Sequence, residues 1–287
     1  MQRSVKIQGI AILVLLFLTL GIWYAALYED RRGLLTVSFL DVGHGDAIFI
    51  DAPSGKQVLI DGGKGRAVLR QLSRVSPWWD RSIDVVIATH PDADHIGGLP
   101  DVLARYRVGR IFRSSVEDDG ADEVAFMRAV EKEIQGGAEE IIAQRGHVID
   151  LGRGAYLEVL FPDRLVPGLE TNTASVITRL VYGDTAFMLT GDSPQAIEEY
   201  LVRLDAEELR SNVLKAGHHG SKTSSAPLFI GFVGPEHVVF SRGCGNIYGH
   251  PHPEVVETFA RFEIPTYDTC EEGTITFASD GATVRKR

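Results

Sequence analysis

Residues 90–95 read His90-Pro91-Asp92-Ala93-Asp94-His95, and this stretch indicates the kind of fold that surrounds it. It follows a wholly apolar run at 85–88 and precedes two glycines at 97 and 98. A short apolar run is typical of a strand covered on both faces, and α/β proteins build their sites on the loops at the carboxyl ends of such strands. Imidazole and carboxylate groups are ligands of zinc, iron and manganese. The stretch therefore predicts a metal site, and a solvated polar loop is the alternative.

The pattern of an apolar strand that ends on polar side chains recurs twice further along the chain. The run at 185–189 leads to Asp192, and the run at 212–217 leads to His218 and His219. A strand-end aspartate alone is as often a helix cap. Tandem histidines on a strand point to opposite faces, so only one of the pair should face the site. Because the pattern repeats, we expect Asp192 and one of the two histidines to be further metal ligands.

Two acidic turns that contain glycine also follow strands, at 41–46 and at 61–63. Asp41, Asp46 and Asp61 are expected to orient metal ligands and not to bind the ion directly. The alternative is that their glycines serve only tight turns. Near the end of the chain, His250 stands before the helix expected after Pro253. It is expected to protonate a leaving group or to contact a phosphate, with a surface turn as the alternative.

The rest of the chain alternates between expected strands and helices. Strands are expected at 34–42, 47–51, 57–60, 85–88, 174–181, 185–189, 212–217 and 237–241. Helices are expected from after Gly98 to near Gly109, at 122–134, at 193–204 and after Pro253. On the helix at 122–134, Val124, Met127, Val130 and Ile134 should form one apolar stripe. Strands that come first, followed by repeated alternating units, predict two sheets packed face to face with helices outside.

The first 28 residues are expected to form a membrane anchor. Residues 9–27 contain no charged side chain, and a helix of that length spans roughly 28 Å, about the hydrocarbon thickness of a bilayer. The alternatives are a buried core helix and a cleaved signal peptide. The run is apolar on every face, and Trp23-Tyr24-Ala25-Ala26 is a poor cleavage site. A joint at 29–33 would then lead into a catalytic domain at 34–287.

The side of the membrane is predicted from charges that nearly balance. Arg3 and Lys6 precede the span, and Arg31 and Arg32 follow it, so the lysine and arginine counts tie. The amino-terminal charge then favours a cytoplasmic head, with the catalytic domain outside the cytoplasm. Cys244 and Cys270 are the two cysteines of the chain, and an oxidising compartment would allow them to pair. The formal net charge of −10 counts against a general nucleic-acid-binding surface, but not against a local basic groove.

Taken together, these motifs resemble the metallo-β-lactamase-fold domain of the ComEC competence proteins. The resemblance begins near Leu34 and covers nearly all of the chain that follows. The matching motifs are Phe39–Asp46, Asp61–Gly63, Thr89–Gly98, Asn172 with Ser175, Leu189–Asp192, Lys215–Ser221 and Gly249–Pro251.

This resemblance implies an α/β fold, a four-layer αββα sandwich of the metallo-β-lactamase type, here preceded by one transmembrane helix. It implies one or two divalent ions, zinc or manganese. The ligand set that carries over is His90, Asp92, Asp94, His95, Asp192 and one of His218 and His219. In the wider superfamily a histidine stands where this chain has Asp92. The third histidine motif is also absent, and Asn172 lies in its neighbourhood. One of the two ion sites is therefore expected to be harder or weaker, and manganese becomes as suitable as zinc.

The function expected is a membrane-anchored, metal-dependent phosphodiesterase or nuclease that acts on DNA or a related phosphodiester. The ions would activate water, Asp192 would bridge them, and Asp94 would orient the nucleophile and accept its proton. His250 would act at the leaving group. Substrate would be held by the polar side chains of Asn172, Ser175, Ser221, Lys222 and His44.

Two other functions are kept as alternatives. The first is a hydrolase of small esters, lactones or phosphorylcholine on the same fold. The second is a non-catalytic partner of a separate membrane channel for DNA uptake. The intact ligand set argues against a pure scaffold, and a single span is not expected to form a pore by itself.

Overall fold

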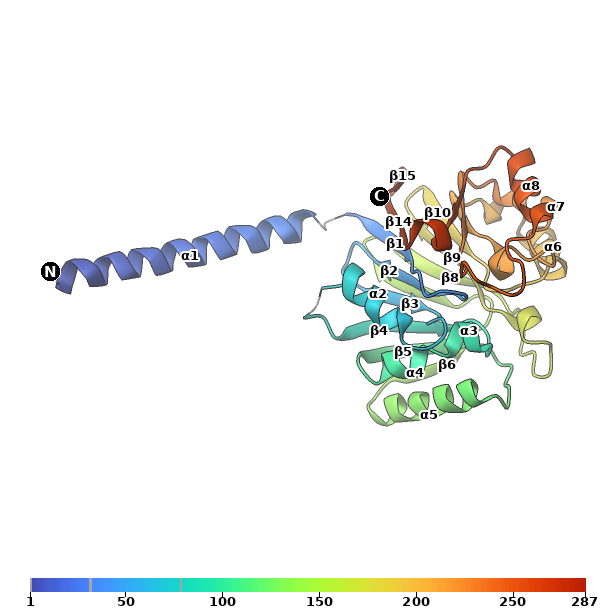
Figure 1. Cartoon of the computed structure of the whole chain (residues 1–287), viewed down its shortest axis with the longest axis horizontal. Coiled ribbons are helices and arrows are strands. Elements are labelled where there is room, and N and C mark those ends of the chain that lie inside the picture. The colour runs from blue at the N-terminus through green and yellow to red at the C-terminus, as the bar shows by residue number, and fades with distance from the viewer. Residues whose placement is uncertain (1, 31–32, 78) are drawn as a thin grey trace.

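The computed structural model describes residues 2–30, 33–77 and 79–287, with the side chains of 2–7 and 25–30 left outside the description. Two β-sheets form the centre of the molecule (Figure 1). The eight-stranded sheet has the order β15-β14-β1-β2-β3-β4-β5-β6. Its strands are β1 (Leu35–Phe39), β2 (Ile48–Asp51), β3 (Gln57–Ile60), β4 (Ser82–Ala88), β5 (Arg107–Arg113), β6 (Glu139–Ile142), β14 (Ile275–Ser279) and β15 (Val284–Lys286).

The seven-stranded sheet has the order β13-β12-β11-β10-β9-β8-β7. Its strands are β7 (Val148–Gly152), β8 (Ala155–Phe161), β9 (Ile177–Tyr182), β10 (Thr185–Leu189), β11 (Val213–Lys215), β12 (His237–Phe240) and β13 (Thr266–Asp268). Strands β3 to β6 are parallel to one another, as are β10 to β13, whereas β3 is antiparallel to β2 and β10 is antiparallel to β9. Parallel neighbours place successive loops at the same edge of each sheet, where a site can form.

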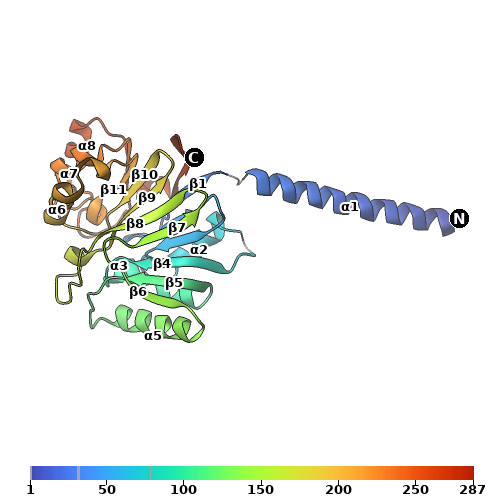
Figure 2. The same cartoon turned by 180° about the vertical axis from the view of Figure 1, so that it is seen from behind.

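Helices cover the outer face of each sheet (Figures 1 and 2). The eight-stranded sheet is covered by α2 (Ala67–Val75), α3 (Ala93–Ile96), α4 (Leu99–Leu103) and α5 (Ala121–Gln135). The other sheet is covered by α6 (Gln195–Asp205), α7 (Pro227–Val233) and α8 (Pro253–Arg261). Short turns complete the described chain: η1 (Asn172–Ala174), η2 (Ala206–Leu209), η3 (Gly217–Gly220) and α9 (Thr269–Glu272). The molecule is therefore the four-layer αββα sandwich that the sequence predicts.

Side-chain alternation along the strands creates these layers. On β2, Ile48 and Ile50 face the cluster between the two sheets, whereas Phe49 faces the cluster under the helices. On β4, Val85 and Ile87 face inward in the same way, and Val86 faces the helices. A strand of period two that is apolar at every position can fill two layers at once. The apolar runs of the sequence therefore place both sheets in the interior.

Two sequence-based expectations about helices are wrong in detail. The helix expected from Gly98 to near Gly109 ends at Leu103, because residues 107–113 pair with β4 as strand β5. On α5, the buried side chains are Glu123, Phe126 and Val130, whereas Val124 and Ile134 are exposed. Val124 and Ile134 are as apolar as the residues that pack on the sheet, so apolar character alone could not show which face of the helix is buried.

Helix α1 (Gln2–Asp30) stands apart from the sandwich (Figures 1 and 2). Its described side chains, residues 8–24, are all exposed and include Phe17, Trp23 and Tyr24. The span expected at 9–27 reaches beyond them, since the side chains of 25–27 lie outside the described part. Among the residues that the structure describes, no helix combines the length and the apolar character needed to cross a membrane.

Candidate metal centre

Four loops meet where the strands of both sheets end, and each contributes a possible metal ligand. Asp46 precedes β2, His95 follows β4, Asp192 follows β10, and His219 follows β11. One ligand atom from each of these residues lies within 4.8 Å of the others. A second group with the same property consists of His44, Asp94 and His219. The fold thus gathers side chains that are up to 173 positions apart in the sequence into one buried cluster.

Three buried histidines at the cluster or beside it have one ring nitrogen without a hydrogen-bond partner. The Nε2 atoms of His90, His95 and His219 are buried and have no hydrogen-bond partner. The Nδ1 atom of His219 lies 2.7 Å from the carbonyl oxygen of Ser241, so Nδ1 carries a proton and Nε2 is the nitrogen that a metal ion could bind. A buried nitrogen without a partner is costly unless a ligand occupies it. Imidazole nitrogens held in this way fit a divalent transition metal.

One carboxylate, that of Asp61, orients two of these imidazoles. Asp61 Oδ2 lies 2.7 Å from Nδ1 of His95 and accepts its proton as a hydrogen bond. The same oxygen accepts a hydrogen bond from the hydroxyl of Thr89 at 2.7 Å. Thr89 Oγ1 then lies 3.0 Å from Nδ1 of His90 and can accept from it. Asp61 is fully buried, so it acts on the histidine rings, directly and through Thr89, as its position in the sequence predicts.

Three short distances connect four of the donors. Asp192 Oδ2 lies 3.3 Å from Nε2 of His95 and 3.3 Å from Nε2 of His219. Asp94 Oδ2 lies 3.4 Å from Nε2 of His219. Zinc–ligand bonds of about 2.0 Å in a tetrahedron place neighbouring ligand atoms about 3.3 Å apart. These three distances suit one divalent ion shared by His95, Asp192 and His219, which belong to the same group of candidate ligands, and Asp94 reaches that group through His219.

The tandem histidines reach the site from a strained turn and not from a strand. His218 and His219 lie in η3 with φ values of 48° and 56°, in the left-handed region that non-glycine residues rarely adopt. The turn brings His218 Nε2 to 3.6 Å from Asp192 Oδ2 as well. The expectation that only one histidine can face the site, which assumes strand geometry, is wrong. The pair still differs in environment, since His219 is buried and His218 is partly exposed.

His90 and Asp92 lie beside the cluster but belong to neither group of candidate ligands. His90 Nε2 is 3.7 Å from Asp92 Oδ2, and the two imidazole rings of His90 and His95 have centroids 4.1 Å apart. Ser175, expected to contact substrate, is fully buried. Its hydroxyl accepts from the backbone N–H of Asp192 and lies 3.4 Å from Nδ1 of His90. Ser175 is thus placed to position these two residues, and its burial keeps it from substrate.

The mouth of the site is lined by aromatic rings. His44 stacks on Tyr248 with centroids 5.1 Å apart and approaches His219 at 4.6 Å. His250 lies 5.9 Å from His44 and 5.4 Å from His218, measured between ring centroids. A disulfide between Cys244 and Cys270 ties this loop to α9. His44 and His250 thus lie beside the donor cluster, and their contact with substrate stays a prediction.

Other residues predicted at the site have local roles. The side chain of Asp41 accepts a hydrogen bond from the N–H of Gly43, two residues further on. Ser221 is buried and hydrogen-bonds to Thr223, whereas Lys222 is exposed. Asn172 starts the turn η1, and its Oδ1 is buried without a hydrogen-bond partner. The structure therefore does not place Asp41 or Ser221 against the donor cluster.

Sequence reasoning missed Lys215, which is fully buried within the cluster. Its ammonium lies 2.5 Å from Asp46 Oδ2, 3.2 Å from Asp192 Oδ1 and 2.8 Å from the carbonyl oxygen of Gly191. Burial would lower the pKa of Lys215, but the charges of Asp46 and Asp192 outweigh it and raise the pKa above its ordinary value. The signal was present in the sequence, because a lysine at the end of the apolar strand at 213–215 must find a partner.

Asp46 reaches this cluster because Gly45 has no side chain. A Cβ atom on Gly45, whose φ is +123°, would lie 2.0 Å from the backbone oxygen of Asp94. The loop that carries Asp46 therefore lies directly against the loop that carries Asp94, and the N–H of Asp46 donates to that same oxygen at 3.2 Å. The glycine of the acidic turn thus serves a close approach between the two loops.

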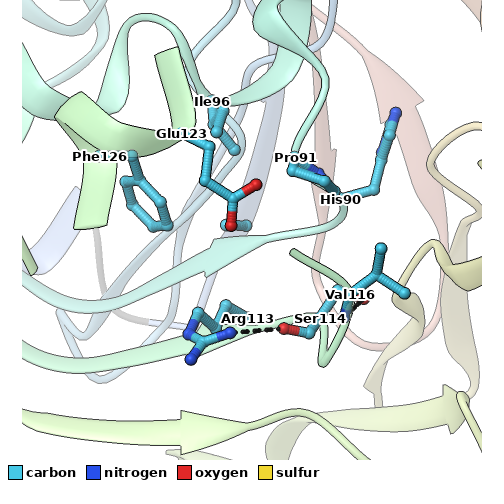
Figure 3. A pocket seen from close by; sticks show the side chains of 9 residues that line it. His90, Pro91, Ile96, Arg113, Ser114, Val116, Glu123 and Phe126 are labelled. Atoms are coloured by element: carbon cyan, nitrogen blue, oxygen red, sulfur yellow. Dashed lines mark hydrogen bonds between the residues drawn. The ribbon is translucent and has the colours of Figure 1, made fainter. Parts of the chain in front are cut away.

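A small pocket lies behind the histidine loop (Figure 3). His90 is the only one of the candidate donors in its lining, and Figure 3 shows its imidazole directed away from Glu123 and Phe126. Arg113 in the same lining pairs with Glu140, and Glu123 accepts from the backbone of Asp118. This pocket is therefore distinct from the donor cluster and is not the expected substrate site.

The histidines of the site fall into two electrostatic classes. Burial would lower the pKa of His95 and of His219, but the carboxylate of Asp192 and its neighbours outweigh burial and hold both pKa values well above the ordinary range. At the mouth, burial and then neighbouring histidines lower the pKa of His44 and of His250 to about 4. His44 and His250 are therefore neutral at pH 7, and each offers one N–H donor.

Comparison with known proteins supports a common family. The sequence model of the metallo-β-lactamase superfamily matches residues 40–241. ComE operon protein 3 of Bacillus subtilis (strain 168) is 30% identical over 198 residues, which are 69% of this chain and 25% of that protein. Competence protein ComA of Neisseria gonorrhoeae is 33% identical over 171 residues, 60% of this chain and 22% of that protein. The chain thus spans about a quarter of the length of these relatives.

A solved structure shows the same fold. Igni18, described as a novel metallo hydrolase from Ignicoccus hospitalis KIN4/I, superposes with a TM-score of 0.53 at 17% identity. The match covers 85% of this chain and 98% of that one. At this identity the likeness establishes the architecture alone.

Replacing Asp61 should weaken metal binding without unfolding the protein. In Asp61→Asn, an amide cannot accept all the hydrogen bonds that now come from Thr89 and His95, so the imidazoles lose their orientation. We expect zinc affinity, measured by competition with a chelator, to fall about 10- to 100-fold. Asp84→Asn is the matched control, since Asp84 also accepts from a backbone N–H, that of Gln57, but lies outside both donor groups. Equal zinc affinities of the two variants would contradict the orienting role.

Metal binding should release protons, and affinity should rise with pH. In the metal-free protein the raised pKa values of His95 and His219 mean that both rings are protonated at pH 7, and a metal ion must displace those protons. Calorimetric zinc titrations at pH 7 in two buffers with different ionisation enthalpies should show one to two protons released. The stability of the metal-free protein should depend on pH in the opposite direction from the metal affinity. Because both folded pKa values are raised, this contribution is complete below about pH 6.5 and is lost as pH rises through them. His147→Ala should leave the proton count unchanged, and buffer-independent heats would contradict the prediction.

Proposed function

The chain belongs to the metallo-β-lactamase superfamily as a ComEC-like domain, and from this premise we propose that it is a metal-dependent phosphodiesterase that acts on DNA or a related phosphodiester. The observation that carries the proposal is the convergence of Asp94, His95, Asp192 and His219 at the shared edge of the two sheets, with carboxylate oxygens 3.3–3.4 Å from imidazole nitrogens. The fold and the donor set support a metal-dependent hydrolase. The gonococcal relative is named as a competence protein, which favours DNA among phosphodiesters.

Asp94, His95, Asp192 and His219 would hold a zinc or manganese ion, and His90 with Asp92 would hold a second, weaker one. A bound divalent ion lowers the pKa of water toward neutrality and neutralises charge on phosphoryl oxygens. Nitrogen and carboxylate donors in this combination suit zinc, and the carboxylates also suit manganese. Lys215 keeps the carboxylate of Asp192 ionised, and Asp61 orients the ring of His95, before any ion binds.

The residues of the chain supply the remaining steps. The side chain of Asp94 is 29% exposed, whereas that of Asp192 is 3% exposed, so Asp94 borders the solvent. It can accept a hydrogen bond from the attacking water, orient it toward phosphorus and take its proton. His44 and His250, neutral at the mouth, would each donate a hydrogen bond to a phosphate oxygen. This role replaces protonation of the leaving group by His250, which would need a cationic ring at pH 7.

We further propose that α1 holds the domain at a cell membrane, with the catalytic domain outside the cytoplasm. The support is the uncharged run at 9–27 and the exposure of every described side chain of α1. An extracytoplasmic domain is also compatible with the disulfide between Cys244 and Cys270, since such bonds persist in oxidising compartments. A separate membrane channel remains a candidate partner, because the relatives are about four times longer than the matched part.

Removing the charge of either Asp94 or Asp192, the two carboxylates proposed to bind the metal ion, should abolish hydrolysis. Asp94→Asn and Asp192→Asn should each lower turnover of bis-p-nitrophenyl phosphate about 10³-fold or more, since several kcal/mol of transition-state stabilisation is lost. Asp101→Asn is the control, because it only loses an exposed pair with Arg66. Circular dichroism should show all three variants folded. The substrate panel should include single-stranded DNA, phosphorylcholine and lactones. Lactone or ester hydrolysis without phosphodiester cleavage would instead support the small-ester alternative.

The membrane proposal predicts that the full chain sediments with membranes and resists carbonate extraction. Leu15→Arg combined with Leu18→Arg should release it, because each central arginine costs about 2.5–3.5 kcal/mol in a bilayer. Ile247→Arg is the control, since Ile247 is exposed on the catalytic domain. Protease added to intact spheroplasts should digest the domain. Complete protection until lysis would place the domain in the cytoplasm and contradict the proposed side.

A further inference from the structure

Lys215 is the only buried ammonium among the described residues, and it lies inside the donor cluster. Three oxygen atoms surround its Nζ atom: Asp46 Oδ2 at 2.5 Å, Gly191 O at 2.8 Å and Asp192 Oδ1 at 3.2 Å. No nitrogen or sulfur ligand is among these contacts. Such a group of oxygens, two of them from carboxylates, is the environment that a hard divalent cation prefers.

Asp192 divides its two oxygens between two positive charges. Its Oδ1 contacts the ammonium, whereas its Oδ2 faces the Nε2 atoms of His95 and His219. Asp46 lies on the ammonium side, because its Oδ2 makes the shortest contact of the group and its side chain is 2% exposed. Asp46 also has an atom within reach of His95, Asp192 and His219, and its Oδ1 lies 3.4 Å from Nδ1 of His219. Its 2.5 Å contact with the lysine is the shorter of the two.

We propose that the ammonium of Lys215 occupies a built-in cation position at the inner end of the cluster. It takes the place of a metal ion there, fixes Asp192 so that Oδ2 faces the imidazoles, and makes Asp46 its own counter-ion and not a metal ligand. Asp46 and Asp192 are buried negative charges, and the ammonium neutralises one of the two where both meet it. Lys215 is therefore a positioning residue that also keeps a metal ion out of the position that its ammonium occupies.

This inference rests on the proposed metal site, but not on the substrate or on any hydrolytic activity. It predicts how a variant that lacks the ammonium of Lys215 binds cations. Without the ammonium, the oxygens of Asp46, Asp192 and Gly191 lose their partner, and two buried carboxylates are left to share a space that the side chain vacated. A hard cation that prefers oxygen should then enter. Calcium is the suitable probe, because it binds oxygen ligands and competes poorly for the imidazoles of the zinc site.

The experiment compares zinc-loaded full-length chains titrated with Ca²⁺, with bound ions counted by elemental analysis after gel filtration. Wild type should retain no calcium, Lys215→Ala should retain about one Ca²⁺ per chain, and Lys215→Ala with Asp46→Asn should retain none. Calcium should also raise the melting temperature of Lys215→Ala and leave that of wild type unchanged. A folded Lys215→Ala chain that takes up no calcium overturns the proposal.

The variant Asp46→Asn, with Lys215 retained, provides a second, independent test. It preserves the shape of the side chain and removes only one buried charge. If Asp46 serves the lysine, the zinc content and zinc affinity of this variant should stay within about threefold of wild type, well short of the 10- to 100-fold loss expected when a group that supports a metal ligand is removed. Loss of one zinc ion from Asp46→Asn would overturn the proposal, and this test decides alone if Lys215→Ala does not fold.

Discussion

The carboxylate of Asp192 is the interaction on which the rest of the site depends. It is almost fully buried, and a buried charge is tolerated only when it is paired and hydrogen-bonded. Its pairing draws in Lys215 from the neighbouring strand β11, His95 from the loop after β4, and His219 from η3. One charged group thereby joins loops from both sheets. The αββα sandwich is what allows this, because it brings the strand ends of two sheets to the same edge.

Hydrogen bonds from neighbouring groups fix the orientation of the three buried imidazole rings. Asp61 fixes His95 directly and His90 through Thr89, while the carbonyl of Ser241 fixes His219. Each contact places the proton on Nδ1 and leaves Nε2 free. The strained backbone of His218 and His219 is maintained by the packing around it, as is common where geometry serves a site. Rigid imidazoles reduce the reorganisation that ion binding would otherwise require.

The outer part of the site differs from the interior in charge and in composition. His44 and His250, which stack with Tyr248, carry no charge at neutral pH and lie in front of a strongly charged interior. A phosphodiester anion approaching this mouth would meet neutral hydrogen-bond donors before it met the buried carboxylates. The net charge of −10 makes such shielding relevant, because like charges repel at short range.

The sequence alone determined the fold class and most of the chemistry of the site. Apolar runs that end on Asp and His residues indicate strands with a functional edge, because burial on both faces and polarity at the ends are properties of single segments. For this reason the order of residues along the chain is enough to propose His90 to His95, Asp61, Asp192 and the tandem histidines as site residues. Tertiary structure alone decided which side chains meet. It brought Asp46 and Lys215 into the cluster, buried Ser175 behind His90, and turned His218 toward Asp192 through a left-handed turn. These outcomes depend on distances between loops far apart in sequence and on backbone conformations set by packing, neither of which the pattern of a single segment contains.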